Sequence, residues 1–193
     1  MMIKKCIVIT QEKISLEEID SIKSLLDAGC ERIHIRKPNS IDSELRPYLD
    51  LLCSKVDSSK LTMHYYHNLA KEYGFGGVHG FSEKAEMFDF KSVSSHSIEE
   101  MENLNNIDYS FISPVFDSIS KVGYKSAFSL ENLKNFIDKK PLFDVVALGG
   151  IDVSKLDLLK ENHFNTIALL GGVWKDGCEN ATNNFLKIYN KWK

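Results

Sequence analysis

The chain reads DVVALGG at residues 144–150 and TIALLGG at residues 166–172. Each stretch is a short apolar run that ends in two glycines, a pattern typical of a buried strand that enters a tight turn. Amphipathic segments follow at 154–161 and 181–192. A strand, a glycine turn and a helix in this order predict a parallel α/β sheet.

The same unit is found along the whole sequence. Strands are expected at 6–10, 32–37, 61–65, 77–79, 92–96, 109–116, 144–148 and 166–170. Helices are expected at 16–28, 43–56, 130–137, 154–161 and 181–192, with shorter ones ending near Tyr73 and starting near Ile98. Eight alternating units favour a closed (β/α)8 barrel, a TIM barrel, over the alternative of an open flavodoxin-like sheet. We therefore predict an α/β fold in which residues 1–193 form one barrel domain. The domain must be compact, because TIM barrels usually have ~250 residues.

Composition narrows the possible partners. A formal net charge of −3 gives no reason to expect nucleic acid or an anionic membrane as partner. No apolar run is long enough to cross a bilayer, and the first strand is too short to be the apolar part of a signal peptide, so we expect a cytoplasmic protein. The four cysteines are widely spaced without a CxxC pair, which predicts free thiols.

The two glycine pairs are the first candidate site. Ligands bind to a TIM barrel where each strand ends and its loop begins, and phosphate commonly lies beyond strands seven and eight. Gly149-Gly150 and Gly171-Gly172 stand at those two positions. Glycine lets backbone N–H groups approach a phosphate closely. One pair alone is well explained as a turn, but two pairs at these positions predict a phosphate site.

The second strand contributes a candidate cation. Alternation places His34 and Arg36 on the face that points into the barrel mouth, and Lys37 on the other face. A charge in the mouth is costly unless it meets an anion or a polar partner. Arg36 is therefore predicted to clamp a phosphate or pyrophosphate, with a structural ion pair as the alternative. Lys37 is expected to be a solvated charge.

Further candidates lie on the fifth strand and in the loop after the sixth. Ser94 and His96 share a strand face, which offers a ligand a hydroxyl and an imidazole, although His96 is explained equally well as a structural hydrogen-bonder. Lys121 lies in the longest loop and is either a group that closes over an anion or a solvated lysine.

Two pairs of residues have the form of a capping box at the start of a helix. Ser15 with Glu18, and Ser97 with Glu100, match the spacing in which a hydroxyl caps the helix and an acid follows three residues later. Three histidines, His64, His67 and His79, lie near the ends of strands three and four. A metal site there is not favoured, because no carboxylate nearby completes a usual ligand set.

The pattern resembles the thiamine phosphate synthase/TenI family over essentially the whole chain. The matching pieces are HIR at 34–36, LA at 69–70, GVH at 77–79, SSHS at 94–97, SPVF at 113–116 followed by Lys121, GGI at 149–151, and the turn at Gly171. The resemblance implies a barrel that joins hydroxyethylthiazole phosphate to hydroxymethylpyrimidine pyrophosphate and releases pyrophosphate. It also implies Mg²⁺ as cofactor and makes a homodimer a fair expectation.

The same resemblance implies roles for individual residues. Arg36, Ser94 and Lys121 correspond to contacts with pyrophosphate, whereas Gly150 and Gly171 correspond to backbone donors to the thiazole phosphate. The candidate site residues are His34, Arg36, Ser94, His96 and Lys121 as catalytic groups, and Arg36, His64, Ser94, Lys121, Gly149, Gly150, Gly171 and Gly172 as binding groups.

The chain departs from the family at its metal ligands. The synthase pattern ends strand three with Asn-Asp, and this chain has His64 and Tyr65 there. The second magnesium aspartate has no clear counterpart, and Glu83 is the candidate substitute. Two alternatives therefore stay open. One is a TenI-like thiazole tautomerase in which His34 or His96 serves as general acid and base, and the other is a non-catalytic barrel that binds a phosphorylated ligand.

Overall fold

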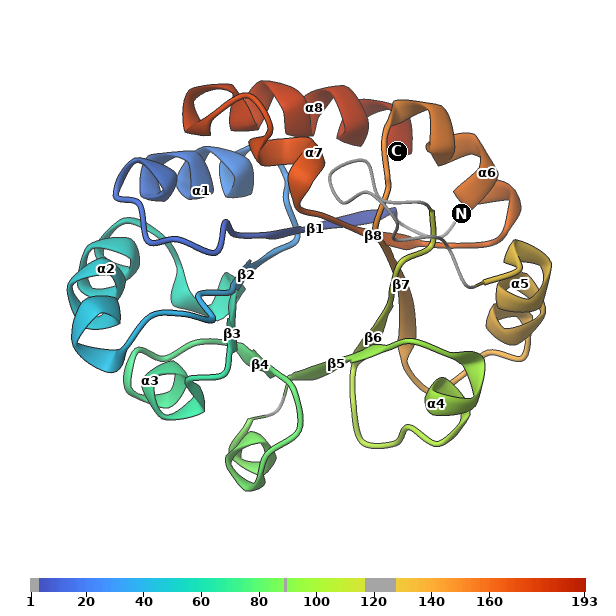
Figure 1. Cartoon of the computed structure of the whole chain (residues 1–193), viewed down its shortest axis with the longest axis horizontal. Helices are drawn as coiled ribbons and strands as arrows, with labels where there is room; N and C mark the ends of the chain where they lie inside the picture. Colours follow the sequence, from blue (N-terminus) through green and yellow to red (C-terminus); the bar gives the residue numbers. More distant parts are fainter. Residues whose placement is uncertain (1–3, 89, 117–127) are drawn as a thin grey trace.

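Eight parallel strands close into a barrel in the computed structural model, which describes residues 4–88, 90–116 and 128–193 (Figure 1). The strands are β1 (Lys5–Ile9), β2 (Arg32–Ile35), β3 (Leu61–His64), β4 (Gly77–His79), β5 (Lys91–Ser95), β6 (Tyr109–Ile112), β7 (Asp144–Leu148) and β8 (Thr166–Leu169). Each strand pairs with the next along the chain, and β1 pairs with β8 to close the sheet. The predicted barrel is confirmed, and the open-sheet alternative is wrong.

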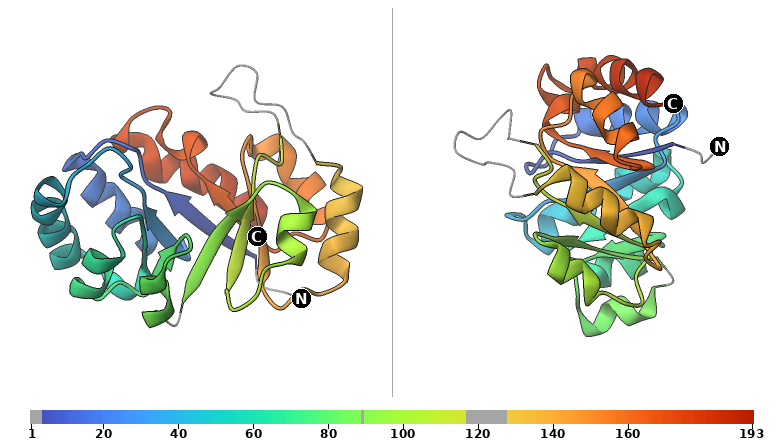
Figure 2. Two further views of the ribbon diagram at one scale, coloured as in Figure 1. Left: turned by 60° about the horizontal axis from the view of Figure 1, so that its bottom comes forward. Right: turned by 90° about the vertical axis from the view of Figure 1, so that its right-hand side faces the viewer.

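Helices form a ring outside the strands (Figures 1 and 2). They are α1 (Glu17–Asp27), α2 (Asp42–Lys55), α3 (His67–Glu72), α4 (Ile98–Glu102), α5 (Leu130–Asp138), α6 (Leu156–Glu161), α7 (Gly171–Trp174) and α8 (Ala181–Trp192). Short 3-10 turns are η1 (Ser58–Lys60), η2 (Glu83–Met87), η3 (Val153–Lys155) and η4 (Cys178–Asn180). Among the described residues, no helix combines the length and apolar character that a membrane span requires.

The alternation of side chains along each strand produces two cores. In β1, Cys6 and Val8 are fully buried against the helix layer, whereas Ile7 and Ile9 pack inside the barrel with Phe111 of β6. The inner cluster fills the middle of the barrel. Because the cluster is small, the two ends of the barrel remain available for cavities. The four cysteines are free thiols, as predicted.

Two local predictions of the sequence are wrong. The strand expected at 109–116 ends as β6 at Ile112, since Pro114 has no N–H with which to continue a ladder. Helix α1 begins after Leu16 without any side-chain cap, so Ser15 does not cap it. Its expected partner, Glu18, is fully buried and serves a different purpose, described below.

The other predicted cap is confirmed. The Ser97 hydroxyl accepts a hydrogen bond of 3.1 Å from the backbone N–H of Glu100, at the start of α4. The Glu100 carboxylate in turn accepts one of 2.6 Å from the backbone N–H of His96. This cap fixes the direction in which the chain leaves β5.

Candidate functional site

The carboxyl ends of the strands surround a cavity of about 730 Å³, called the mouth cavity below. Its polar lining includes Glu12, Arg36, His64, His79 and Ser94, which lie at or just beyond the ends of β1 to β5. Because TIM barrels bind their ligands at this end, the mouth cavity is the candidate active site.

Arg36 reaches the mouth cavity from the end of β2. Its Nη1 lies 2.6 Å from Oε1 of Glu12, whose side chain is half exposed. The backbone N–H of Arg36 donates to the Thr10 hydroxyl over 2.9 Å, which anchors this residue to the end of β1. The guanidinium is therefore held in place by a carboxylate that solvent reaches easily, so an anion in the cavity can compete with Glu12 for it.

Lys37 is not solvated, and that prediction is wrong. Only 1% of its side chain is exposed, and Nζ donates to Oε2 of Glu18 over 2.6 Å and to the carbonyl oxygens of Gln11 and Lys13 over 2.7 and 2.8 Å. The Tyr48 hydroxyl donates to the same Glu18 oxygen over 2.9 Å. Burial lowers the pKa of Lys37, and the Glu18 carboxylate opposes that shift. The hydrogen-bonding groups of Lys37, Glu18 and Tyr48 are therefore paired without water, on the outer side of the barrel sheet.

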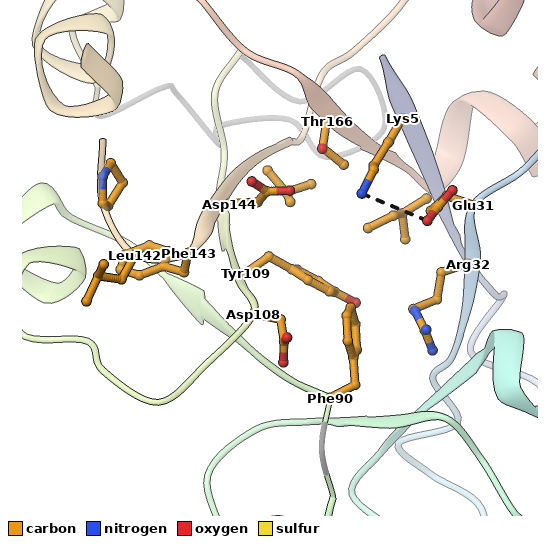
Figure 3. A pocket seen from close by; sticks show the side chains of 13 residues that line it. Lys5, Glu31, Arg32, Phe90, Asp108, Tyr109, Leu142, Phe143, Asp144 and Thr166 are labelled. Atoms are coloured by element: carbon orange, nitrogen blue, oxygen red, sulfur yellow. Dashed lines mark ion pairs between the residues drawn. The ribbon is translucent and has the colours of Figure 1, made fainter. Parts of the chain in front are cut away.

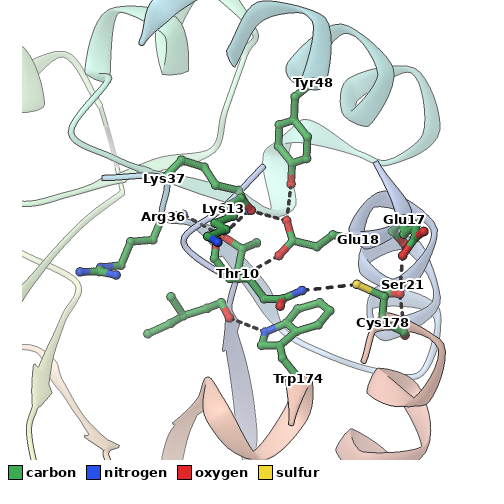
Figure 4. Close-up of polar contacts among 12 residues, drawn as sticks. Thr10, Lys13, Glu17, Glu18, Ser21, Arg36, Lys37, Tyr48, Trp174 and Cys178 are labelled. Carbon is green, nitrogen blue, oxygen red and sulfur yellow. Dashed lines mark hydrogen bonds and ion pairs between the residues drawn. The ribbon is translucent and has the colours of Figure 1, made fainter. Parts of the chain in front are cut away.

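This buried network supports the candidate site. In Figure 4 the Arg36 side chain points away from Glu18, whereas the Lys37 side chain reaches toward it. The second Glu18 oxygen accepts from the backbone N–H of Gln11 over 2.8 Å. These three hydrogen bonds, from Lys37 to two loop carbonyl oxygens and from the loop to Glu18, hold the segment that supplies Glu12. The network therefore sets the position of the Arg36–Glu12 pair without touching the cavity.

Three histidines from adjacent strands meet at the floor of the mouth cavity: His34 of β2, His64 of β3 and His79 of β4. Nδ1 of His34 lies 2.9 Å from Nε2 of His64, and the rings of His64 and His79 stack with centroids 4.1 Å apart. The Ser92 and Ser94 hydroxyls bond to the two ring nitrogens of His79, over 2.9 and 3.0 Å. One nitrogen from each of the three rings lies within 4.8 Å of the other two.

Burial disfavours the protonated form of all three rings. Burial lowers the pKa of His79 to about 3. Burial and then the neighbouring histidines lower the pKa of His34 and of His64 well below the ordinary range. An efficient general base has a pKa near the working pH, so His79 is poorly suited to accept a proton. A neutral imidazole instead offers a lone pair to a hydrogen-bond donor or to a metal ion.

Of the other predicted site residues, some line the mouth cavity and others do not. Ser94 lines the mouth cavity, as does His64. His96 does not line it, and its Nδ1 donates to the Ser113 carbonyl over 3.0 Å. Lys121 lies outside the described residues, and so does the side chain of Glu83.

The glycine pairs stand next to the mouth cavity. Leu148 and Leu170, which directly precede 149–150 and 171–172, both line it. The first pair follows β7, and the second forms the first turn of α7. Gly172 also lies close to the turn that follows β7, because a Cβ added at Gly172 would be 3.5 Å from the Ile151 carbonyl oxygen. The two turns are therefore adjacent, as a shared phosphate site requires.

Gly149 could not be replaced without strain. Its φ is +97°, a backbone conformation that residues with a Cβ rarely adopt. A Cβ at this position would lie 3.0 Å from both Cα and Cβ of Pro114. Glycine is thus required here by backbone geometry and by the close approach of the β6–α5 connection.

The described donors of the mouth cavity do not fit magnesium. Mg²⁺ takes oxygen ligands in octahedral geometry, but the grouped donors here are the imidazole nitrogens of the three histidines. Among the described side chains that line the cavity, Glu12 is the one carboxylate, and it is paired with Arg36. Among the described residues, the cavity therefore lacks the aspartates that the family resemblance implies as magnesium ligands.

A second cavity, of about 390 Å³, lies at the opposite, amino end of the barrel (Figure 3). Some of the charged side chains in its lining have partners. Nζ of Lys5 lies 4.0 Å from Oε1 of Glu31, and the Arg32 guanidinium stacks 4.1 Å above the centre of the Phe90 ring. Thr166 Oγ1 is buried there and has no hydrogen-bond partner within the described ranges. TIM barrels use their carboxyl end for catalysis, so this cavity is not the candidate active site.

Comparison with known proteins shows which proteins this chain is similar to. A family model described as thiamine monophosphate synthase matches residues 6–173. The thiamine-phosphate synthase of Photorhabdus laumondii is 22% identical over an alignment of 167 residues, which covers 80% of this chain and 77% of that protein. A thiamine phosphate pyrophosphorylase from Bacteroides thetaiotaomicron has a similar structure, with 26% identity, a TM-score of 0.78, and coverage of 97% of this chain and 96% of that one. One from Pyrococcus furiosus has the same fold, with 20% identity, a TM-score of 0.76, and coverage of 97% and 95%.

Proposed function

The chain belongs to the thiamine monophosphate synthase family, and we propose that it joins hydroxyethylthiazole phosphate to hydroxymethylpyrimidine pyrophosphate in the mouth cavity. In this reaction the carbon–oxygen bond between the pyrimidine methylene and pyrophosphate breaks, and pyrophosphate leaves with the bonding electrons. The thiazole nitrogen then forms a bond to that methylene carbon. The observation that carries the proposal is the family match over residues 6–173.

Arg36 has the chemistry for the leaving pyrophosphate. Its guanidinium presents parallel N–H donors that match phosphate oxygens and stabilise negative charge as it develops. Glu12 holds it in the absence of substrate at 2.6 Å, and pyrophosphate, with more charge, would take its place. Ser94 adds a hydroxyl on the same cavity wall. Lys121 stays a prediction of the family resemblance.

The glycine turns are suited to the thiazole phosphate. Backbone N–H groups can approach a phosphate closely at Gly150 and Gly171, since no side chain stands between. The neighbouring Leu148 and Leu170 supply an apolar surface for the thiazole ring in the same cavity. This arrangement would place the thiazole phosphate on the β7–β8 side and the pyrophosphate on the β2 side.

A proton-transfer reaction on the thiazole phosphate is the second candidate. The features that favour it are the loss of the acidic ligand that the family resemblance implies at the position of Tyr65, and the group of histidines nearby, which are common proton carriers. Against it, burial lowers the pKa of His34 well below the range of an effective base, and His96 does not line the mouth cavity. The synthase reaction is therefore preferred. Cytoplasmic location, a homodimer and a requirement for Mg²⁺ stay predictions.

The test is a single-pot assay of both reactions. The purified chain is mixed with the thiazole phosphate and the pyrimidine pyrophosphate, in parallel with no added metal, with Mg²⁺ and with Zn²⁺. Thiamine phosphate and pyrophosphate should form in equal amounts, in proportion to enzyme. Exchange of deuterium into the thiazole phosphate without formation of thiamine phosphate would support the tautomerase instead, and release of neither product at high enzyme concentration would overturn the synthase proposal.

A further inference from the structure

We propose that His34, His64 and His79 form a binding site for a divalent transition-metal ion such as Zn²⁺, at the floor of the mouth cavity. The three side chains come from the carboxyl ends of three adjacent strands, and one nitrogen from each lies within 4.8 Å of the other two. This site does not depend on the proposed reaction.

The spacing is close to that of an occupied site. Zinc–nitrogen bonds are ~2.0–2.1 Å long, so tetrahedral ligands lie about 3.4 Å apart. His34 Nδ1 and His64 Nε2 are 2.9 Å apart and must separate slightly, whereas the widest pair must contract. The stacked rings of His64 and His79 have an interplanar angle of 19°, so they must also rotate until their lone pairs converge. Each of these adjustments is a rotation or a small shift of a side chain.

Metal binding changes the hydrogen bonds among the rings. A neutral imidazole has one N–H and one lone pair, and the metal takes the lone pair while the N–H stays on the other nitrogen. An ion that enters between the rings therefore replaces the hydrogen bond between His34 Nδ1 and His64 Nε2.

The groups behind the rings resemble the supports of known metal sites. A histidine ligand usually bonds through its other nitrogen to a fixed polar group, which orients the ring. His34 Nε2 contacts the Tyr109 hydroxyl on the opposite side of its ring from His64. Ser92 holds Nδ1 of His79, and the Ser94 hydroxyl that is now bonded to Nε2 would give way to the ion. His34 and His79 are thus each oriented through one nitrogen.

One side of the cluster faces the cavity that holds Arg36. His64 and His79 both line that cavity, whereas His34 is completely buried below them. Three protein ligands and one open position are the usual arrangement of a catalytic zinc site. The remaining position would hold water or an oxygen atom of an anionic ligand. Imidazole is a ligand for zinc, copper, iron and nickel, whereas magnesium prefers oxygen, so the donor set selects a transition metal.

The decisive experiment uses cobalt, because Co²⁺ takes the same ligands as Zn²⁺ and absorbs visible light. The full chain without an affinity tag is stripped with a chelator and titrated with Co²⁺, then with Zn²⁺, in a buffer that does not bind metals. We expect one ion per chain, a visible spectrum typical of a four-coordinate site, and loss of that spectrum when Zn²⁺ displaces Co²⁺. A large excess of Mg²⁺ should leave the spectrum unchanged.

Variants separate this site from adventitious binding. His79→Ala and His64→Ala should weaken binding of Co²⁺ by more than about 100-fold, since loss of a supporting group alone costs ~10–100-fold. Tyr109→Phe removes the hydroxyl that contacts Nε2 of His34, and therefore tests such a supporting group. The matched control is His163→Asn, at an exposed histidine with φ of 64° that pairs with Asp138 and lies outside the mouth cavity, and it should bind as the unaltered chain does.

Three results would overturn the proposal. They are no saturable binding of Co²⁺ or Zn²⁺, binding that survives both His79→Ala and His64→Ala in folded protein, and displacement of Co²⁺ by Mg²⁺. Circular dichroism and a thermal melt establish that each variant is folded. If His64→Ala does not fold, His79→Ala decides the question, because His79 is only partly buried.

Discussion

Nζ of Lys37 lies 2.6 Å from a carboxylate oxygen of Glu18, and neither side chain is more than 1% exposed. Loss of one member would leave the other as an unpaired buried charge, which is far more costly than the loss of an ion pair in water. The remaining lone pairs and protons are also satisfied, by Tyr48 and by the loop carbonyl oxygens. This pair is therefore the most sensitive electrostatic feature behind the candidate site.

Lys37→Met should lower the free energy of unfolding by about 3–5 kcal/mol, because it leaves the Glu18 carboxylate buried without its cation. Urea denaturation measures this. The control is Lys23→Met, which removes an exposed pair of the same 2.6 Å length, with Asp27, and should cost at most about 1 kcal/mol. The double variant Glu18→Gln/Lys37→Met should recover part of the loss. Equal costs for Lys37→Met and Lys23→Met would show that the buried pair has no special importance.

Arg36→Gln should weaken binding of the pyrimidine pyrophosphate by about tenfold to hundredfold, since hydrogen bonds to charged groups are worth ~1.5–3 kcal/mol each. Isothermal calorimetry measures the dissociation constant. Arg46→Gln is the matched control, because Arg46 lies on the outer helix α2, where it pairs with Asp42 and Glu72. A change of affinity that is the same for both variants would reject a specific clamp.

Gly149→Ala should reduce both stability and binding of the thiazole phosphate. The added Cβ meets Pro114 at 3.0 Å, and the backbone has φ of +97°. Gly80→Ala provides the comparison, because Gly80 has φ of +100° but nothing within 4 Å of an added Cβ. Unfavourable backbone conformations cost about 1–3 kcal/mol, so thermal melts should show this cost in both variants and an additional loss in Gly149→Ala. Identical melting curves would contradict the steric argument.

The pH dependence of stability should contain a contribution from Cys30. Burial raises the pKa of its thiol from 9.0 to about 12. The folded protein therefore holds this proton more tightly than the unfolded chain does. The resulting stabilisation is present below pH 9 and is lost as the pH rises toward 12.

Urea denaturation across this alkaline range, compared with a Cys30→Ala variant, measures the contribution. The unaltered chain should lose more stability than the variant as pH rises, while deprotonation of the lysines affects both alike. Parallel pH profiles for the two proteins would show that the Cys30 thiol ionises equally easily in the folded and unfolded states.

The barrel could be predicted because its signals are local. Each strand is a short apolar run, and each helix repeats its apolar positions within a few turns, as at 144–148 and 181–192. The pattern also placed Arg36 and Ser94 at the same end of the barrel, since strand ends in a parallel sheet meet at one edge. Both residues line the mouth cavity.

What could not be predicted depends on distant contacts. Lys37 was expected in solvent because alternation turns it away from the mouth, but its partner Glu18 lies 19 positions away on α1. Alternation correctly turns Lys37 away from the mouth but does not reveal that a helix covers that face. The same limit concealed the grouping of His34 with His64 and His79, since it requires the exact register of three neighbouring strands.

Closure of the sheet also constrains how the chain can acquire its structure during synthesis. The first strand leaves the ribosome early, yet one of its two neighbours, β8, begins only at Thr166. The contact of Lys4 with Asn165 spans 161 positions. Until Thr166–Leu169 has emerged, a nascent chain has two unpaired sheet edges that can pair with other chains. A ribosome that stalls before this point would therefore leave an aggregation-prone product, even though most of the strands are already complete.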